Sequence, residues 1–412
     1  MDTNVCQYST FDLFSRPPTE IGLEEVQEHE ILPLTALQSN TSTIEFSITG
    51  AGDEYIDLSS LRLYLQVTVT DVENKAPEAG KVRLIELWPQ AMFRQVDLYM
   101  NGTLVSTSSN LYAFTAFVST ILGFPKDVKD HQINVLEHLK GWDVEPKKNS
   151  NEALIRLHLP LCQQPRFIPN GVSINLRLLR SNNAFVFANT DGTKEYNISI
   201  DKCRLFVKKI KPSAALLLQH VEEIGKRNAA FPIETISTRF ITLPKGLKDH
   251  DLNNVCQGQL PSEVYIGIVK SEDFSGISTT NPYKFAPHKL ASISLQSNGK
   301  SIPEVPLETD YEKGFFRRAY HTLLDTIQGP CADRESVGIS AADYTSKLCF
   351  YGFSLSQSLS GPNESVPRRE TGYLNAKLRF SEALKDNLNA IFFLVYQNTV
   401  EIDSARNVYC DY

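Results

Sequence analysis

Alternation of apolar and polar residues runs through most of the chain and predicts β-strands. In the segment 93–105, Val96, Leu98 and Met100 alternate with polar residues before Asn101-Gly102 interrupts the run. Asn-Gly is a strong signal for a two-residue hairpin, because both central residues of a type I′ turn have positive φ. The segment therefore predicts a strand, a tight turn and a second strand.

The same pattern returns in the second half of the chain. In the segment 290–302, Ile293 and Leu295 alternate with polar residues before Asn298-Gly299, close to half of the 412 residues after the first turn. Three further features recur in the same order: a strand before the hairpin, helical spacing after it, and a late strand. They pair Leu61–Val69 with Val264–Ile268, Phe114–Ile121 with Phe316–Leu323, and Ile174–Leu178 with Leu374–Leu378. This repetition predicts tandem copies of one β-rich domain.

A short helix is expected after each hairpin, because apolar residues there recur at helical spacing. Asn110 is the candidate N-cap of the first helix and Asp310 that of the second. A third helix is predicted between the copies, where Leu217, Val221 and Ile224 follow Pro212-Ser213. Its apolar stripe predicts that it docks on another surface instead of acting as a free tether.

The chain divides into four expected segments. Residues 1–40 are expected to form an extended arm, or alternatively a frayed terminus, because they contain Pro17-Pro18, an acidic stretch and little alternation. Residues 41–210 and 233–412 are expected to be the two β-domains, with the linker helix in 211–232. About eight short strands per domain, separated by Gly, Asn and Pro turns, are typical of an antiparallel sandwich such as a jelly roll. The long charged connection 125–151 is predicted to lie between strands and to be functional or an interaction surface.

Composition and charge exclude several classes of protein. Charged residues make up 22% and hydrophobic residues 42% of the chain, as in ordinary globular proteins. A net charge of −7 gives no general attraction to nucleic acid or to an anionic membrane. We expect no secretory signal and no membrane span, and therefore synthesis in the cytosol. Seven scattered cysteines predict reduced thiols instead of a disulfide framework.

Motifs for catalysis, cofactors and metals are missing from the sequence. Gly50-Ala51-Gly52 fails the dinucleotide fingerprint and predicts a turn. His29-Glu30 lacks the second histidine of a zinc-binding helix, and Asp249-His250-Asp251 is interpreted as a solvated loop. No two carboxylates are marked as a catalytic pair. We therefore expect no enzyme, no cofactor and no metal site.

One basic cluster lies near the end of the first domain. It comprises Lys202, Arg204, Lys208, Lys209 and Lys211. A patch that faces nucleic acid is one interpretation, and the solvated edge of a strand is the other. Interleaved Leu205, Val207 and Ile210 favour the strand edge.

A set of segments spread over nearly the whole chain has a recognisable wording: Asp12–Thr19, Gly50–Leu58, Phe93–Leu104, Gly258–Pro261, Asn281–Phe285 and Val400–Val408. Together they resemble one family of viral proteins, the double-jelly-roll major capsid (hexon) proteins of Polinton/Maverick elements and adintoviruses. The resemblance implies an all-β fold of two tandem eight-stranded antiparallel jelly rolls, with short inserted helices. It also implies a homotrimer that forms a pseudo-hexagonal capsomer.

The resemblance further implies capsomers that tile an icosahedral virion, together with penton and minor capsid proteins, around a genome that the chain contacts at most indirectly. Binding energy would then lie in interfaces, where aromatic and arginine side chains contribute most. The candidates are Phe315, Phe316, Arg317, Arg318, Trp88 and Trp142, each of which also fits an ordinary core or surface position. Two alternatives remain open, a carbohydrate-binding tandem sandwich and, with less support, a jelly-roll amidase or glycosidase.

Overall fold

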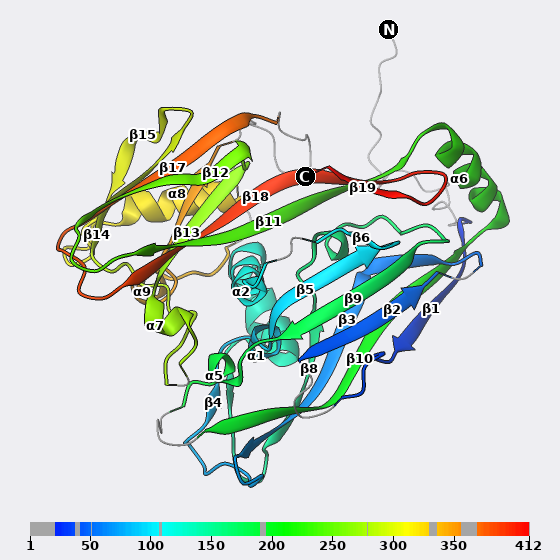
Figure 1. Cartoon of the computed structure of the whole chain (residues 1–412), viewed down its shortest axis with the longest axis horizontal. Coiled ribbons are helices and arrows are strands. Elements are labelled where there is room, and N and C mark those ends of the chain that lie inside the picture. Colours follow the sequence, from blue (N-terminus) through cyan, green and yellow to red (C-terminus); the bar gives the residue numbers. More distant parts are fainter. Residues whose placement is uncertain are drawn as a thin grey trace, which may run out of the picture.

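A computed structural model of the chain shows strands with short helices between them (Figure 1). It describes residues 21–37, 42–50, 52–106, 109–189, 195–277, 279–328, 336–355 and 369–411. Most of the expected arm over residues 1–40 therefore lies outside the described residues.

The first half of the chain forms two four-stranded antiparallel sheets. In spatial order, one sheet contains β1 (Leu23–Ile31), β10 (Tyr196–Pro212), β3 (Tyr55–Asp71) and β8 (Ser150–Arg156). The other contains β2 (Thr43–Thr49), β9 (Ser173–Arg180), β5 (Phe93–Met100) and β6 (Thr103–Leu104). If these eight strands are counted along the chain, the sheets have the orders 1-8-3-6 and 2-7-4-5. This is a jelly-roll arrangement.

The second half repeats the arrangement strand for strand. Its first sheet contains β11 (Ala229–Leu243), β18 (Leu388–Ile402), β13 (Glu263–Lys270) and β16 (Phe350–Ser354). Its second sheet contains β12 (Asp249–Gln259), β17 (Thr371–Phe380), β14 (Leu290–Ser297) and β15 (Lys300–Glu308). The terminal strand β19 (Val408–Asp411) is added beside β18. The predicted tandem repeat is confirmed.

The alternation seen in the sequence separates core from surface in the strands. In β3, Leu61, Leu63, Leu65, Val67 and Val69 are buried, while the residues between them are only partly buried. A period of two places alternate side chains on opposite faces of a sheet. The pattern therefore directs one face of each sheet into the core of its own jelly roll.

Both predicted hairpin turns are confirmed. Asn101 and Gly102 have φ of 46° and 82°, and Asn298 and Gly299 have φ of 48° and 82°. Positive φ at both central residues defines the type I′ turn, whose twist matches that of the flanking strands.

Helices follow the hairpins as predicted, but the predicted caps are wrong. They are α2 (Tyr112–Gly123) and α8 (Arg317–Gln328). Leu111 precedes α2 and provides no side-chain cap, although Asn110 is adjacent. The Asp310 carboxylate accepts a hydrogen bond from the Lys313 amide (3.1 Å) in the turn 311–314, which precedes α8. Apolar periodicity locates a helix, whereas a capping residue several positions upstream can belong to a different turn.

The expected arm over 1–40 is wrong for Leu23–Ile31, because this segment is the first strand of the first jelly roll. β1 pairs with β10 from Leu23 opposite Pro212 to Ile31 opposite Leu205. No side chain of β1 is buried. The strand therefore needs no apolar alternation, and the sequence gives no such signal. The first jelly roll begins near residue 23 instead of residue 41.

The linker helix is confirmed as α6 (Ala214–Lys226), with the Ser213 hydroxyl accepting from the Leu216 amide (3.4 Å). The predicted apolar stripe is only partly covered within this chain: Leu217 and Ile224 are half-buried, whereas Val221 is 61% exposed. The Tyr55 hydroxyl lies 2.9 Å from Nδ1 of His220, and the two rings stack at 5.7 Å. Figure 1 shows α6 at the outer edge of the molecule.

The charged connection 125–151 contains more regular structure than expected. A continuous helical stretch holds α3 (Lys126–Val128), a π-helical turn (Lys129–Ile133) and α4 (Asn134–Glu137), and β7 (Trp142–Asp143) pairs with β4 (Arg83–Leu84). The other short elements are α1 (Trp88–Ala91), a 3₁₀ turn (Pro160–Cys162), α5 (Asn183–Val186), α7 (Ser271–Phe274) and α9 (Ala341–Ser346).

Candidate functional site at the junction of the two jelly rolls

Helix α2 joins the two jelly rolls. It lies between the sheets of the first half and strand β11 of the second half (Figure 1). Nine of its twelve residues are buried, among them Phe114, Phe117 and Ile121. A helix that is apolar on nearly all sides is stable only when other elements cover it. The second jelly roll provides part of that cover.

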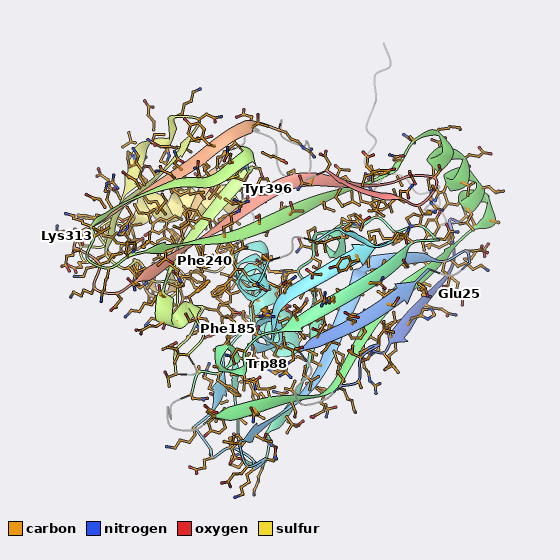
Figure 2. The ribbon with its side chains drawn as sticks, viewed as in Figure 1. Glu25, Trp88, Phe185, Phe240, Lys313 and Tyr396 are labelled. Carbon is orange, nitrogen blue, oxygen red and sulfur yellow. The ribbon has the colours of Figure 1, made fainter. Side chains whose placement is uncertain are left out.

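Aromatic rings form the centre of this junction. Phe117 of α2 stacks on Tyr283 of the second half, with ring centroids 4.2 Å apart and an interplanar angle of 9°. Phe114 contacts Phe274 at 5.2 Å and Phe185 at 5.7 Å. Figure 2 labels Phe185 of α5 near the place where the two halves meet. Stacked and edge-to-face pairs add about 0.5–1.5 kcal/mol each to the burial of the rings.

Hydrogen bonds between the two halves define how they pack at the junction. The hydroxyl oxygens of Thr115 and Thr238 are 2.7 Å apart, and the Tyr283 hydroxyl donates to the Ala113 carbonyl oxygen (3.3 Å). At another point of contact, Asn101 donates to the carbonyl oxygen of Arg406 (2.8 Å), and the Arg406 guanidinium donates to Asn170 Oδ1 (2.9 Å). These contacts hold the two jelly rolls in one relative orientation.

A buried lysine links the insert of the first half to that of the second. Nζ of Lys129 donates to the carbonyl oxygen of Ile121 (2.7 Å) and to that of Val337. Burial lowers the pKa of Lys129 to about 8, and the nearby Asp130 opposes this shift. The Lys126 amide adds a hydrogen bond to the Ser336 carbonyl oxygen (3.0 Å). Sequence reasoning missed Lys129, because a single lysine in a charged stretch has no pattern that distinguishes it.

The basic cluster lies on β10, and three of its five residues form ion pairs with acidic residues. Lys211 pairs with Glu24 (3.3 Å), Arg204 with Glu30 and Lys209 with Glu54 (3.1 Å). Glu24 and Glu30 belong to β1, the neighbouring strand. The acidic stretch and the basic cluster of the sequence therefore meet across one strand pair, which agrees with the strand-edge interpretation of the cluster.

The structure places Asp249, His250 and Asp251 in strand β12, so their interpretation as a solvated loop is wrong. His250 is buried against Phe380 (5.7 Å), whereas Asp249 and Asp251 both pair with Arg379 (3.3 and 2.8 Å). The three side chains do not converge on one point. Across the described ranges, no group of three or more His, Cys, Asp or Glu residues is arranged to hold a metal ion.

The cysteines that the structure describes form no disulfide. They are Cys162, Cys203, Cys256, Cys349 and Cys410. Burial raises the pKa of Cys162 and of Cys203 to about 12. The thiolate is the reactive form, so these two thiols are chemically inert at neutral pH. Cys6 and Cys331 lie outside the described residues.

The six aromatic and arginine candidates separate into core and surface. Trp88 is fully buried beside Trp142 (6.1 Å) and so cannot contact a partner. Phe316 packs against Tyr311 and Tyr344 at 6.1 and 5.8 Å. Phe315 is 63% exposed, and Arg317 and Arg318 are exposed at the start of α8. Only these three therefore share an open surface.

A carboxylate cluster that the sequence did not mark lies on the first sheet of the second half. The Tyr265 hydroxyl donates to Glu263 Oε2 (2.7 Å). Burial, with a smaller contribution from the negative charge of Glu234, raises the pKa of Glu263 to about 7, although the Tyr265 hydrogen bond opposes the shift. The three residues lie on β11 and β13, on either side of β18. Separation in sequence hides such a cluster from motif analysis.

Exposed aromatic rings within the described segments do not gather on one element. They are Phe167, Phe240, Phe315, Tyr373 and Tyr409, from five separate parts of the chain. A carbohydrate-binding sandwich is expected to present rings along a groove, and no single strand here does so.

Comparison with known proteins supports the fold. No protein-family model matches the chain. An uncharacterized protein of Caenorhabditis elegans is 21% identical over 335 residues, which are 78% of this chain and 80% of that protein. The cryo-EM structure of the Sputnik virophage contains a chain that matches with a TM-score of 0.66 and 11% identity, over 100% of this chain and 93% of that one. The chain has the double-jelly-roll fold.

Two further solved structures extend this double-jelly-roll likeness. The Faustovirus major capsid protein matches with a TM-score of 0.59 and 9% identity, over 94% of this chain and 92% of that one. The mavirus major capsid protein matches with a TM-score of 0.53 and 11% identity, over 100% and 96%. The predicted fold class is thus confirmed. None of the helices in the described part has the length and apolar character needed to cross a membrane.

Proposed function

We propose that this double jelly roll is a major capsid protein, of which three copies form a capsomer with a pseudo-hexagonal outline. The observation that carries the proposal is the pair of eight-stranded jelly rolls with identical strand order, held together by α2 and its aromatic cluster. Three such chains supply six similar domains. Six similar domains can occupy a sixfold position of a lattice with a single gene product.

Similarity over the whole length supports the proposal. Sputnik virophage, Faustovirus and mavirus chains match at least 94% of this chain, and two of the three are named as major capsid proteins. We assign the chain a structural and non-enzymatic role in a virion, within the Polinton/Maverick–adintovirus lineage that its sequence resembles. Its capsomers would tile an icosahedral shell around a DNA genome, with penton and minor capsid proteins as further partners.

The rigid junction fits this role, because a lattice requires subunits of one fixed shape. Stacked rings, the Thr115–Thr238 contact and the Lys129 hydrogen bonds all oppose a hinge between the halves. The net charge of −7 and the partly neutralised basic cluster agree with a genome that is enclosed without strong direct contact.

The mass of the purified chain in solution tests the proposal. Multi-angle light scattering should give three times the chain mass of 46.3 kDa. A monomer at every concentration, together with retention of a glycan on an array, would contradict the capsomer and favour the carbohydrate-binding alternative.

A further inference from the structure

Asparagine is followed directly by glycine at three places in the chain, 101–102, 170–171 and 298–299. The three glycines all have positive φ, at 82°, 76° and 82°. The first two pairs belong to the first half of the chain and the third belongs to the second half. Sequence does not distinguish the three pairs, but their surroundings differ.

Arg406 of the second half holds both asparagines of the first half. Nδ2 of Asn101 donates to the Arg406 carbonyl oxygen (2.8 Å), and the Arg406 guanidinium donates to Oδ1 of Asn170 (2.9 Å). Asn170 also donates to the Gly52 carbonyl oxygen (3.0 Å). The Arg406 amide donates to the Asp403 carbonyl oxygen (3.0 Å) in the turn between β18 and β19. Both carboxamides are therefore part of the junction between the two halves.

The third asparagine, Asn298, is held more loosely. Its Oδ1 accepts from the Tyr373 amide (3.1 Å), and its Nδ2 donates to the Thr371 carbonyl oxygen over a long distance (3.4 Å). Both partners belong to its own half. By comparison, Oδ1 of Asn101 accepts from the amide and the hydroxyl of Ser173 at 2.8 and 2.9 Å, besides the bond of its Nδ2 to the second half. Asn298 thus has the longest hydrogen bonds of the three carboxamides.

Asparagine is a chemically labile residue, above all before glycine. The backbone nitrogen of the glycine, which has no side chain to hinder it, attacks Cγ of the asparagine. The new N–C bond closes a succinimide ring, the Cγ–Nδ2 bond breaks, and ammonia leaves with the proton of the glycine amide. Water then opens the ring and gives aspartate or isoaspartate. The reaction consumes water and releases ammonia, and it needs no oxidant, reductant or enzyme.

Access to the reacting atoms also differs between the three places. Asn298 is exposed, and a Cβ on Gly299 would come no closer than 3.8 Å to any atom beyond its chain neighbours, so the attacking nitrogen is not enclosed. Asn170 is half-buried, and a Cβ on its glycine would lie 3.5 Å from Nε of Arg406. Asn101 is exposed like Asn298, so its protection must come from its hydrogen bonds.

Hydrogen bonds affect the rate, because the carboxamide must leave them and rotate toward the glycine nitrogen before the attack. Each net hydrogen bond lowers the fraction of free carboxamide by up to about tenfold. Asn101 must leave three short bonds. Asn298 must leave one bond of ordinary length and one long bond. The folded chain should therefore react first at Asn298.

We propose that Asn298 is a site of spontaneous deamidation in the folded chain, and that Arg406 protects Asn101 and Asn170 from the same reaction. The modification adds a negative charge to an exposed turn of the second half. A carboxylate at position 298 still accepts from the Tyr373 amide and loses only the long bond to Thr371. A carboxylate at position 101 would instead face the Arg406 carbonyl oxygen without a proton between them. The protected position is thus one where the change would weaken the junction.

Mass spectrometry of the aged full-length chain tests the proposal. The wild-type protein is incubated at pH 8, folded in one sample and unfolded in guanidinium chloride in the other, and is then digested with trypsin. The three asparagines appear in separate peptides, Gln95–Lys126, Phe167–Arg177 and Leu290–Lys300. In the folded sample, Asn298 should deamidate at least about tenfold faster than Asn101 or Asn170. In the unfolded sample the three rates should be similar, because no hydrogen bond holds any of them.

The variant Arg406→Asn tests the protection separately. Asparagine tolerates the positive φ of this position (67°), so the turn can keep its shape. The variant loses the guanidinium that binds Asn170 but keeps the backbone carbonyl that binds Asn101. Deamidation of Asn170 should become up to about tenfold faster, while that of Asn101 stays slow. Equal rates at all three asparagines of the folded wild type, or an unchanged rate at Asn170 in the variant, would overturn the proposal.

Two further variants test the consequence of the modification. Asn298→Asp should unfold at the same urea concentration as wild type, whereas Asn101→Asp should unfold at a lower one, because only the second change removes a hydrogen bond between the halves. An equal loss of stability in both variants would contradict the claim that deamidation at position 298 leaves the junction intact.

Discussion

Replacement of Phe117 by alanine should uncouple the two jelly rolls. The Phe117 side chain belongs to the first half, yet its stacking partners Tyr283 (4.2 Å) and Phe285 (6.0 Å) belong to the second. The side chain is 3% exposed. Removal of a buried phenylalanine ring costs about 3–5 kcal/mol of unfolding free energy. Most of the lost free energy should come from the contact between the two halves, so the halves should no longer unfold together.

Intrinsic fluorescence can follow one half by itself. The chain contains two tryptophans, Trp88 and Trp142, and both lie in the first half. Far-UV circular dichroism reports strands of both halves. In urea, the two signals of the wild-type chain should change together, because the junction makes unfolding cooperative. In Phe117→Ala they should separate into two transitions.

Phe46→Ala is the matched control, since Phe46 is fully buried within the first jelly roll in β2. It should lower the midpoint of unfolding by a comparable amount and leave the two signals superimposed. The reasoning is refuted if the Phe117→Ala curves still superimpose, or if the variant loses less than about 1 kcal/mol.

Three other perturbations test separate parts of the structure. Burial raises the pKa of Glu263 from 4.5 to about 7, so between these pH values the folded chain keeps a proton that the unfolded chain loses, and the free energy of unfolding falls as pH rises. Glu263→Gln should therefore be about 2–3 kcal/mol more stable than wild type at pH 8. Below pH 4.5 the two proteins should have similar stability in urea unfolding. Lys129→Met leaves the carbonyl oxygens of Ile121 and Val337 without their donor. The hydrogen-exchange rate of the Lys126 amide, which is bonded to Ser336, should then rise at least tenfold, while the amides of β14 stay protected. Equal protection of the Lys126 amide in both proteins would disprove the role of Lys129 in joining the two halves. Gly141→Ala should lower stability by more than about 2 kcal/mol in thermal unfolding, because φ at Gly141 is 79° and a Cβ there would lie 2.5 Å from the Leu84 carbonyl oxygen. Gly123→Ala is the control and should be neutral in the same assay, because a Cβ at Gly123 would have no atom within 4 Å.

The repeat and the hairpins could be predicted from sequence because local physics determines them. Asn-Gly at positions 101–102 and 298–299 requires positive φ in any context, and period-two alternation in β3 records one buried face. The two helices were found for the same reason, since apolar spacing reflects the surface that each one covers.

The features that were missed depend on partners far away in the chain. β1 has no buried side chain, and its identity as a strand comes from β10, about 180 residues later. Asp249, His250 and Asp251 resemble a polar turn in sequence, yet they alternate between Arg379 and the core because β17 lies beside them. Lys129 became significant only when the fold brought Ile121 and Val337 within its reach.

Sequence alone also could not decide which of the candidate interface residues are exposed. Phe315, Phe316, Arg317, Arg318, Trp88 and Trp142 are equally plausible contacts in sequence, and burial alone removes Trp88. The exposed residues Phe315, Arg317 and Arg318 could be identified from their residue types. The exposed strand β1 could not, because an exposed edge strand and an unstructured arm have similar composition.

Imaging of the purified particle tests the central claim most directly. Single-particle electron microscopy of the full-length chain should show a three-chain ring with six lobes of similar size and a hexagonal outline, since each chain contributes two jelly rolls of the same topology. Isolated two-lobed particles of one chain, seen even when the sample is prepared at high protein concentration, would contradict the claim that this double jelly roll forms a capsomer.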